Sequence, residues 1–134
     1  MNREYDLEER LLDYSSDIIE IVESLNPGLV GTHIGSQLLR AGTSPLFNHG
    51  EAQAAESSKD FIHKMKICHK ELRETYRALR LIKKKPLTRD IDKVDACIKE
   101  TDELIRIFFT SIRTAQKNTV REERETYGSE PSET

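Results

Sequence analysis

The sequence predicts an all-α protein, folded as an antiparallel up-down-up-down four-helix bundle. Apolar residues recur at steps of three and four in four stretches, which is the spacing of one helix face. Breaks rich in proline and glycine separate the stretches, and no segment shows the alternation of a β-strand. Of the 134 residues, 34% are charged and 36% hydrophobic, which suits one domain of thin amphipathic helices around a shared core.

The first helix is expected from Leu7 to about Leu25. Its apolar face consists of Leu7, Leu11, Tyr14, Ile18, Val22 and Leu25. Asn26-Pro27-Gly28 then ends the helix.

The second helix is expected to restart near Leu29, and its pattern is the weakest of the four. Its apolar residues are Leu29, Val30, Ile34, Leu38 and Ala41. Gly42, Pro45 and Gly50 interrupt this pattern. A proline inside a helix costs about 3 kcal/mol, so we expect Pro45 to kink the helix or split it. The alanine-rich segment 51–56 favours resumed helix.

The third helix has the clearest pattern. Ser57 followed by Asp60 resembles a capping box and predicts a helix start or sharp joint. The apolar face then consists of Phe61, Met65, Cys68, Leu72, Tyr76 and Leu79. Lys83 to Lys85 and then Pro86 predict an end near Lys84, because cations stabilise a helix C-terminus and proline does not continue it.

The fourth helix is expected to begin with Thr88 as its N-cap. Its apolar face consists of Ile91, Val94, Ile98, Leu104 or Ile105, Phe108 and Ile112, with Thr101 filling a gap. The pattern fades after Ala115, and residues 120–134 have almost no apolar side chain to bury. We therefore expect a bundle over residues 1–119 and a disordered polar tail over 120–134.

The sequence also indicates the compartment. Its polar start, with Asn2, Arg3 and Glu4, does not resemble a secretory signal, and no apolar stretch is long enough to span a bilayer. Cys68 and Cys97 are too few for a disulfide framework or a zinc cluster, so we expect two reduced core residues. These features predict a soluble cytoplasmic protein without a membrane partner.

One long stretch, from Gln37 to Arg80, carries a recognisable set of residues. They are Gln37-Leu38-Leu39-Arg40-Ala41-Gly42-Thr43-Ser44, Asn48, Glu51-Ala52-Gln53-Ala54-Ala55-Glu56-Ser57, Lys59-Asp60-Phe61-Ile62-His63-Lys64, Lys70-Glu71 and Glu74-Thr75. In order and spacing this set resembles the bacterial four-helix-bundle family that includes proteins encoded in intervening sequences of large-subunit ribosomal RNA genes. The chain departs from the family at Pro45-Leu46-Phe47, where relatives often have smaller residues, and lacks the aromatic pair usual near Arg77 and Ala78.

The resemblance implies a bundle that assembles into ring-like homopentamers. One related group serves as nucleic-acid-binding accessory subunits of diversity-generating retroelements. The activity of most of the family is unknown, so the resemblance does not name a reaction.

No set of residues predicts catalysis, a metal or a cofactor. The histidines, His33, His49, His63 and His69, form no pair at four-residue spacing and no di-iron ligand pattern. The chain has no glycine-rich phosphate loop. Asn48, Glu51, Glu71 and Glu74 are either a polar active-site cluster or interhelical hydrogen-bonding residues, and we favour the structural role.

A row of basic residues on the third helix is the one surface feature that suggests a function. Its members are Lys59, His63, Lys66, Lys70, Arg73, Arg77, Arg80 and Lys84. At 100° per residue they fall within an arc of about 100° on the side away from the apolar face. We call this row the basic stripe; no exposed aromatic residue is expected to be interleaved with it. The formal net charge of −3 means that any attraction to phosphates must be local.

These observations predict a non-enzymatic, self-assembling helical scaffold or adaptor. The nucleic-acid-binding candidates are Lys59, Lys66, Lys70, Arg73, Arg77, Arg80 and Lys84, facing RNA, DNA or an acidic protein. The alternatives are a purely structural homo-oligomer without nucleic-acid affinity and an enzyme with an unrecognised polar pocket.

Overall fold

The computed structural model describes residues 6–129, with only the backbone described for 127–129. Four helices follow one another: α1 (Leu7–Ser24), α2 (Leu29–Gln53), α3 (Ser58–Lys84) and α4 (Ile91–Ser129). No strand occurs within residues 6–129. The predicted all-α four-helix architecture is confirmed.

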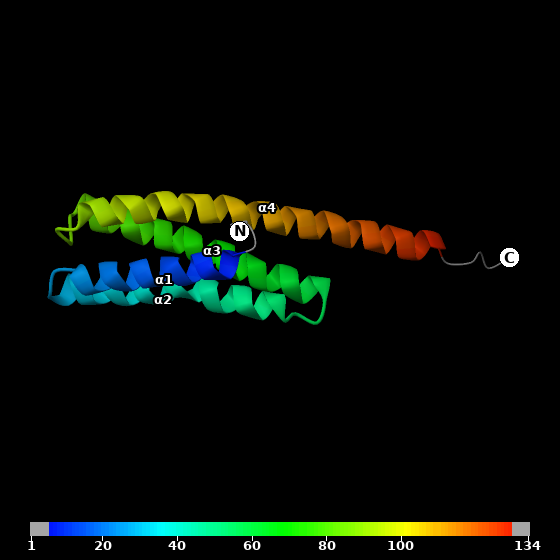
Figure 1. Cartoon of the computed structure of the whole chain (residues 1–134), viewed down its shortest axis with the longest axis horizontal. Helices are drawn as coiled ribbons and strands as arrows, with labels where there is room; N and C mark the ends of the chain where they lie inside the picture. Colours follow the sequence, from blue (N-terminus) through cyan, green and yellow to red (C-terminus); the bar gives the residue numbers. More distant parts are fainter. Residues whose placement is uncertain (1–5, 130–134) are drawn as a thin grey trace.

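The helices form an antiparallel up-down-up-down bundle, in which each helix packs on the next one along the chain (Figure 1). Figure 1 shows α1 beside α2 and α3 beside α4. α1 makes fewer contacts with α4 than with α2. Part of the α1–α4 interface is polar, because Arg10 Nε donates to Glu100 Oε2 at 2.7 Å.

The core contains most of the predicted apolar residues together with Ile21 and Ile82, which were not predicted, whereas Leu29 and Val30 of the expected second face are 88% and 56% exposed. Its large, fully buried members are Leu11, Ile18, Ile21, Leu38, Leu72, Leu79, Ile82, Val94, Leu104 and Phe108. Of the two alternatives in α4, Leu104 is the core residue, whereas Ile105 is only partly buried. Cys68 and Cys97 are buried free thiols, and burial raises the pKa of each to about 12.

α2 continues without a break through Gly42, Pro45 and Gly50, so Pro45 does not split the helix. A Cβ on Gly42 would lie 2.7 Å from Ile18 Cγ2, so this glycine allows α1 to approach closely rather than ending the helix. Pro45 is buried within the helix, and its carbonyl oxygen lies 3.6 Å from the Cys68 thiol of α3. The segment around Gly42 and Pro45 has a low helix propensity, and its packing against α1 and α3 keeps it helical.

The helix ends agree with the sequence at α3 and differ at α4. Ser57 is the N-cap of α3, its hydroxyl accepting from the Asp60 N–H at 3.0 Å, and α3 ends at Lys84 as predicted. Thr88 does not cap α4, which begins at Ile91. The Thr88 hydroxyl instead donates to the Ser24 carbonyl at 3.1 Å and accepts from the Asp90 N–H. It ties the α3–α4 loop to the end of α1.

α4 is longer than the sequence predicts. It runs to Ser129, so residues 120–129 of the expected disordered tail are helical, while 130–134 lie outside the described residues. Figure 1 shows this end of α4 projecting past the turn between α2 and α3. Within this segment, the Thr126 hydroxyl donates to the Glu122 carbonyl one turn earlier at 2.9 Å. Between residues 6 and 129, no helix is both long and apolar enough to cross a membrane.

Candidate nucleic-acid interface

The basic stripe is an exposed surface of α3. All eight of its residues are exposed, while Met65, Cys68, Leu72 and Leu79 of the same helix are buried. The stripe therefore faces away from the core, as the helical spacing predicts. α3 has 27 residues, which corresponds to a row roughly 40 Å long.

The cations of the stripe form no ion pair with any acidic residue in the part of the chain that the structure describes. Among the described residues, the ion pairs made by the basic residues of α3 involve Lys64, which binds Glu51, and Lys83, which binds Asp95, and neither lysine belongs to the stripe. Within the stripe, Arg77 donates to the Arg73 carbonyl at 3.4 Å, and Arg80 lies over the Tyr76 ring. The positive charge of the stripe is consequently not neutralised by pairing within the bundle.

An aromatic side chain of α4 borders the stripe, which the sequence did not reveal. Phe109 is 50% exposed, and its ring centroid lies 6.1 Å from that of His69 on α3. The Arg113 guanidinium lies 5.8 Å from the same centroid. Periodicity assigns Phe108 to the core, but the contact between Phe109 and α3 depends on how the two helices pack. Burial lowers the pKa of His69, and neighbouring Arg73 lowers it further.

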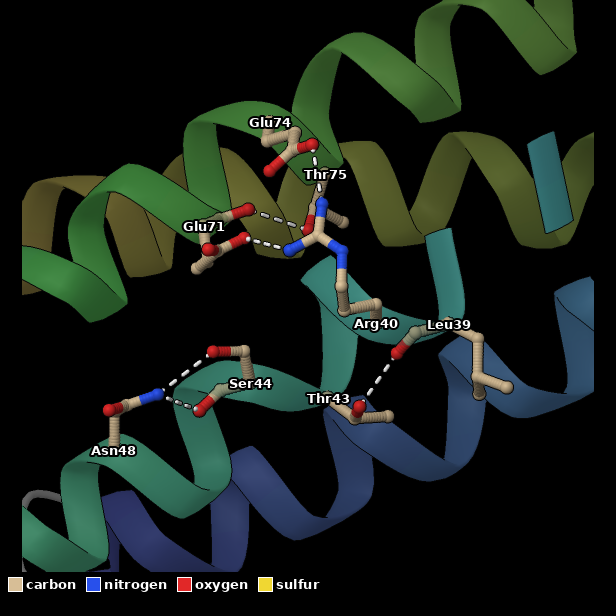
Figure 2. Close-up of polar contacts among 8 residues, drawn as sticks. All are labelled: Leu39, Arg40, Thr43, Ser44, Asn48, Glu71, Glu74 and Thr75. Carbon is tan, nitrogen blue, oxygen red and sulfur yellow. Dashed lines mark hydrogen bonds and ion pairs between the residues drawn. The ribbon is translucent and has the colours of Figure 1, made fainter. Parts of the chain in front are cut away.

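On the other side of α3, an ion-pair cluster joins α2 to α3 (Figure 2). Arg40 Nη1 donates to Glu71 Oε2 at 3.1 Å, and Arg40 Nη2 donates to Glu74 Oε1 at 2.7 Å. The Glu71 side chain is only 11% exposed, whereas that of Arg40 is 56% exposed. Burial raises the pKa of Glu71 and its hydrogen bond to Glu74 raises it further, whereas Arg40 lowers it. Arg40 lies within the stretch that carries the family resemblance.

The remaining members of the predicted polar set have separate partners. Glu51 accepts from Lys64 of α3 at 2.7 Å, which is an interhelical contact. Asn48 bonds within α2, to the carbonyl and hydroxyl oxygens of Ser44, as Figure 2 shows. Glu51 and Asn48 therefore do not bind the same partners as Glu71.

The histidines are dispersed. His33 and His63 are exposed, His69 is half-buried against Phe109, and His49 is buried in the core. Over residues 6–129, no group of three His, Cys, Asp or Glu side chains is arranged to hold a metal ion.

A surface hollow of about 640 Å³ lies where the ion-pair cluster meets the stripe. Its lining includes Arg40, Glu71 and Glu74 together with the stripe residues Lys70, Arg73 and Arg77. Both carboxylates in the hollow are bound by Arg40. The hollow therefore offers cations to a ligand more readily than it offers a free acid or base.

The fold and this surface define a small helical-bundle protein with a cationic face on α3 that makes no ion pair with the acidic residues of the described chain, 6–129. Residues 3–110 match the family described as 23S rRNA-intervening sequence protein. The chain belongs to that family, as the stretch from Gln37 to Arg80 indicated.

A solved structure of similar fold supports the same assignment. It is a protein of unknown function from the S23 ribosomal protein family of Bacteroides thetaiotaomicron. The two chains share 27% sequence identity with a TM-score of 0.67, over 78% of this chain and 96% of the other. No curated protein sequence matches this chain significantly.

Proposed function

We propose that the protein is a non-enzymatic helical scaffold that assembles with copies of itself and binds nucleic acid through the basic stripe. The observation that supports binding is the row of seven exposed lysines and arginines on α3, none with an acidic partner among the described residues. Lys64 and Lys83 of the same helix lie outside the stripe and do form ion pairs, with Glu51 and Asp95. Among the described residues, the cations of α3 without ion pairs are thus those of its outer face. A row of this kind matches the regular charge spacing of a phosphate backbone.

Self-assembly is supported by apolar side chains on the outside of α1 and α2. Leu12, Ile19 and Leu39 are exposed there, between 41% and 49%. A second copy of the chain is the occupant we propose, because the family resemblance implies a homopentamer and a repeated interface buries the same side chains in each copy. Assembly also multiplies the stripe, so several weak contacts act together. Light scattering should report a mass several times 15.4 kDa.

An enzyme is the less favoured alternative. The hollow beside Arg40 contains two carboxylates, but each is held in an ion pair rather than free to transfer protons. The two free cysteines are buried, which raises the thiol pKa and lowers nucleophilicity. We place the scaffold in the cytoplasm, where such thiols stay reduced.

The experiment is charge reversal on the stripe. Lys66→Glu, Arg73→Glu and Arg80→Glu together should abolish binding to a labelled RNA or DNA of about 20 nucleotides, which covers the roughly 40 Å of α3. The salt dependence should disappear with the binding, while the helical circular-dichroism signal is retained.

The control should reverse three exposed cations that belong neither to the stripe nor to an ion pair. Arg89, Lys99 and Arg121 meet this condition among the described residues, whereas Arg10 and Arg106 are paired with acids. Equal loss of binding in both triple variants would show diffuse attraction. A wild-type protein that binds nothing at low salt would leave a purely structural oligomer.

A further inference from the structure

Phe109 is an apolar ring left half in solvent beside a charged surface. Its chain neighbour Phe108 is fully buried, so α4 already supplies one aromatic residue to the core at this level. The exposed ring is accompanied by the Arg113 guanidinium at 5.8 Å and by the His69 ring at 6.1 Å, tilted by 41°. Three planar groups from two helices are thus gathered at one point of the surface.

This point lies next to the middle of the basic stripe. The Lys83–Asp95 ion pair and the His69–Phe109 contact fix the antiparallel register of α3 and α4. On α3, the exposed stripe residue Lys66 precedes His69, and the exposed stripe residues Lys70 and Arg73 follow it. Cations therefore flank the ring on both sides along α3.

We propose that Phe109, with Arg113 and His69, stacks an unpaired base of a single-stranded nucleic acid whose phosphates follow the basic stripe. This inference rests on the proposed function and specifies its ligand. A base presents its flat face only when it is unpaired or splayed out, whereas the bases of a duplex are already stacked on one another. The phenylalanine ring and the planar arginine guanidinium can stack on any of the bases, because every base has a flat aromatic face.

The proposal separates Phe109 from the other strongly exposed phenylalanine. Phe47 is 65% exposed on α2, and among the described residues it has no ring or cation contact of the kind that surrounds Phe109. Exposure is the shared property of the two rings, and the cationic setting is the difference. Phe47 is therefore the matched control.

The first test compares affinities for a fluorescein-labelled single-stranded RNA and for the corresponding duplex. Phe109→Ala should weaken single-strand binding by about 5- to 150-fold, the range for loss of one stacked base, and leave duplex binding unchanged. Phe47→Ala should change neither. Equal weakening towards both nucleic acids would point to a general disturbance of the bundle and overturn the stacking site.

The second test reads stacking directly. The chain contains no tryptophan, so Phe109→Trp introduces a single reporter whose fluorescence should be quenched by the single strand and not by the duplex. Phe47→Trp should show no quenching. If the Lys66, Arg73 and Arg80 reversal abolishes binding but Phe109→Ala and Phe109→Trp show no effect, the stacking site is wrong while the proposed function stands. If the wild type binds neither nucleic acid, or binds polyglutamate equally well, both proposals fail.

Discussion

The hydroxyl oxygen of Tyr14 lies 2.6 Å from Thr101 Oγ1, in a buried hydrogen bond that joins the first helix to the last. Thr101 donates to the Cys97 carbonyl at 2.7 Å, so Tyr14 is the donor in the bond between the two hydroxyls. Burial raises the pKa of Tyr14 well above its usual value, and the phenol stays protonated. Together with the Arg10–Glu100 and Lys93–Asp17 ion pairs, this bond ties α1 to α4.

Thr101→Val removes the acceptor that lies 2.6 Å from the buried Tyr14 hydroxyl. We expect the free energy of unfolding to fall by about 1–3 kcal/mol, measured by urea denaturation. Adding Tyr14→Phe should recover part of the loss, because no polar group then remains unpaired. Strictly additive losses in this double-mutant cycle would show that the two hydroxyls do not interact.

Two glycines of α2 should respond in opposite directions to alanine. Gly42→Ala places a methyl group 2.7 Å from Ile18 Cγ2, and Ile18 is fully buried, so we expect a loss of about 1–3 kcal/mol from overpacking. A Cβ on Gly50 would meet open space, so Gly50→Ala should gain about 0.5–1 kcal/mol from helix propensity. Thermal unfolding of the two variants measures the difference. An undiminished stability of the Gly42→Ala protein would mean that α1 and α2 can separate slightly.

Local sequence patterns could predict what depends on neighbours along the chain. The apolar faces, the cap at Ser57 and the polar gap at Thr101 all follow from spacing within one helix. The path of α2 through Pro45 could not be predicted, because it depends on packing against α1 and α3. The exposed contact of Phe109 with His69 depends on the register between α3 and α4, which the apolar periodicity of each single helix does not determine.

Arg40 compensates a largely buried carboxylate. Arg40→Gln leaves Glu71 without its cation, and we expect a loss of about 1–2 kcal/mol at pH 7. The pKa of Glu71 is already raised by burial, so its ionisation favours the unfolded state, and the loss should grow as the pH rises above 4.5 and vanish below that value. Urea titrations at several pH values test this.

A solvent-exposed pair supplies the control. Arg106→Gln removes the ion pair with Asp102 within α4, whose side chains are far more exposed, and should cost less than about 0.5 kcal/mol at any pH. Equal, pH-independent losses in the Arg40 and Arg106 variants would contradict a role for the buried carboxylate.

His49 should make the bundle sensitive to mild acid. It is buried against Phe108, its Nδ1 has no hydrogen-bond partner within the described residues, and burial lowers its pKa below 6.5, although Glu8 opposes this. Protonation therefore favours the unfolded state: stability is full above pH 6.5 and falls as the pH drops below it. The thermal midpoint of unfolding should therefore decrease as the pH is lowered from about 7 to about 5.

His49→Leu should remove part of that fall, and the rest includes His69, whose pKa is lowered in the same direction. His33→Leu, at an exposed position of the same helix, should leave the fall unchanged. An identical pH profile for wild type and His49→Leu would show that His49 carries no part of it.

The end of α4 should be dispensable for stability. Residues from Val120 to Thr126 are exposed, so truncation after Asn118 removes little buried surface. Differential scanning calorimetry should give a thermal midpoint within a few degrees of the full chain. A large drop would indicate that the projecting helix docks on another copy.

The projecting end of α4 also divides the molecule electrically. Of the 21 basic and 24 acidic residues of the chain, two and five respectively follow Asn118, which leaves 19 of each before that point. All of the formal charge of −3 thus belongs to one extremity of the chain. Within the described residues, this end of α4 has two Arg and three Glu residues between positions 119 and 129, so it has a net negative charge. If the basic stripe binds a polyanion as proposed, the repulsion from this end is screened beyond the Debye length of about 8–10 Å, and it favours approach from the side of α3.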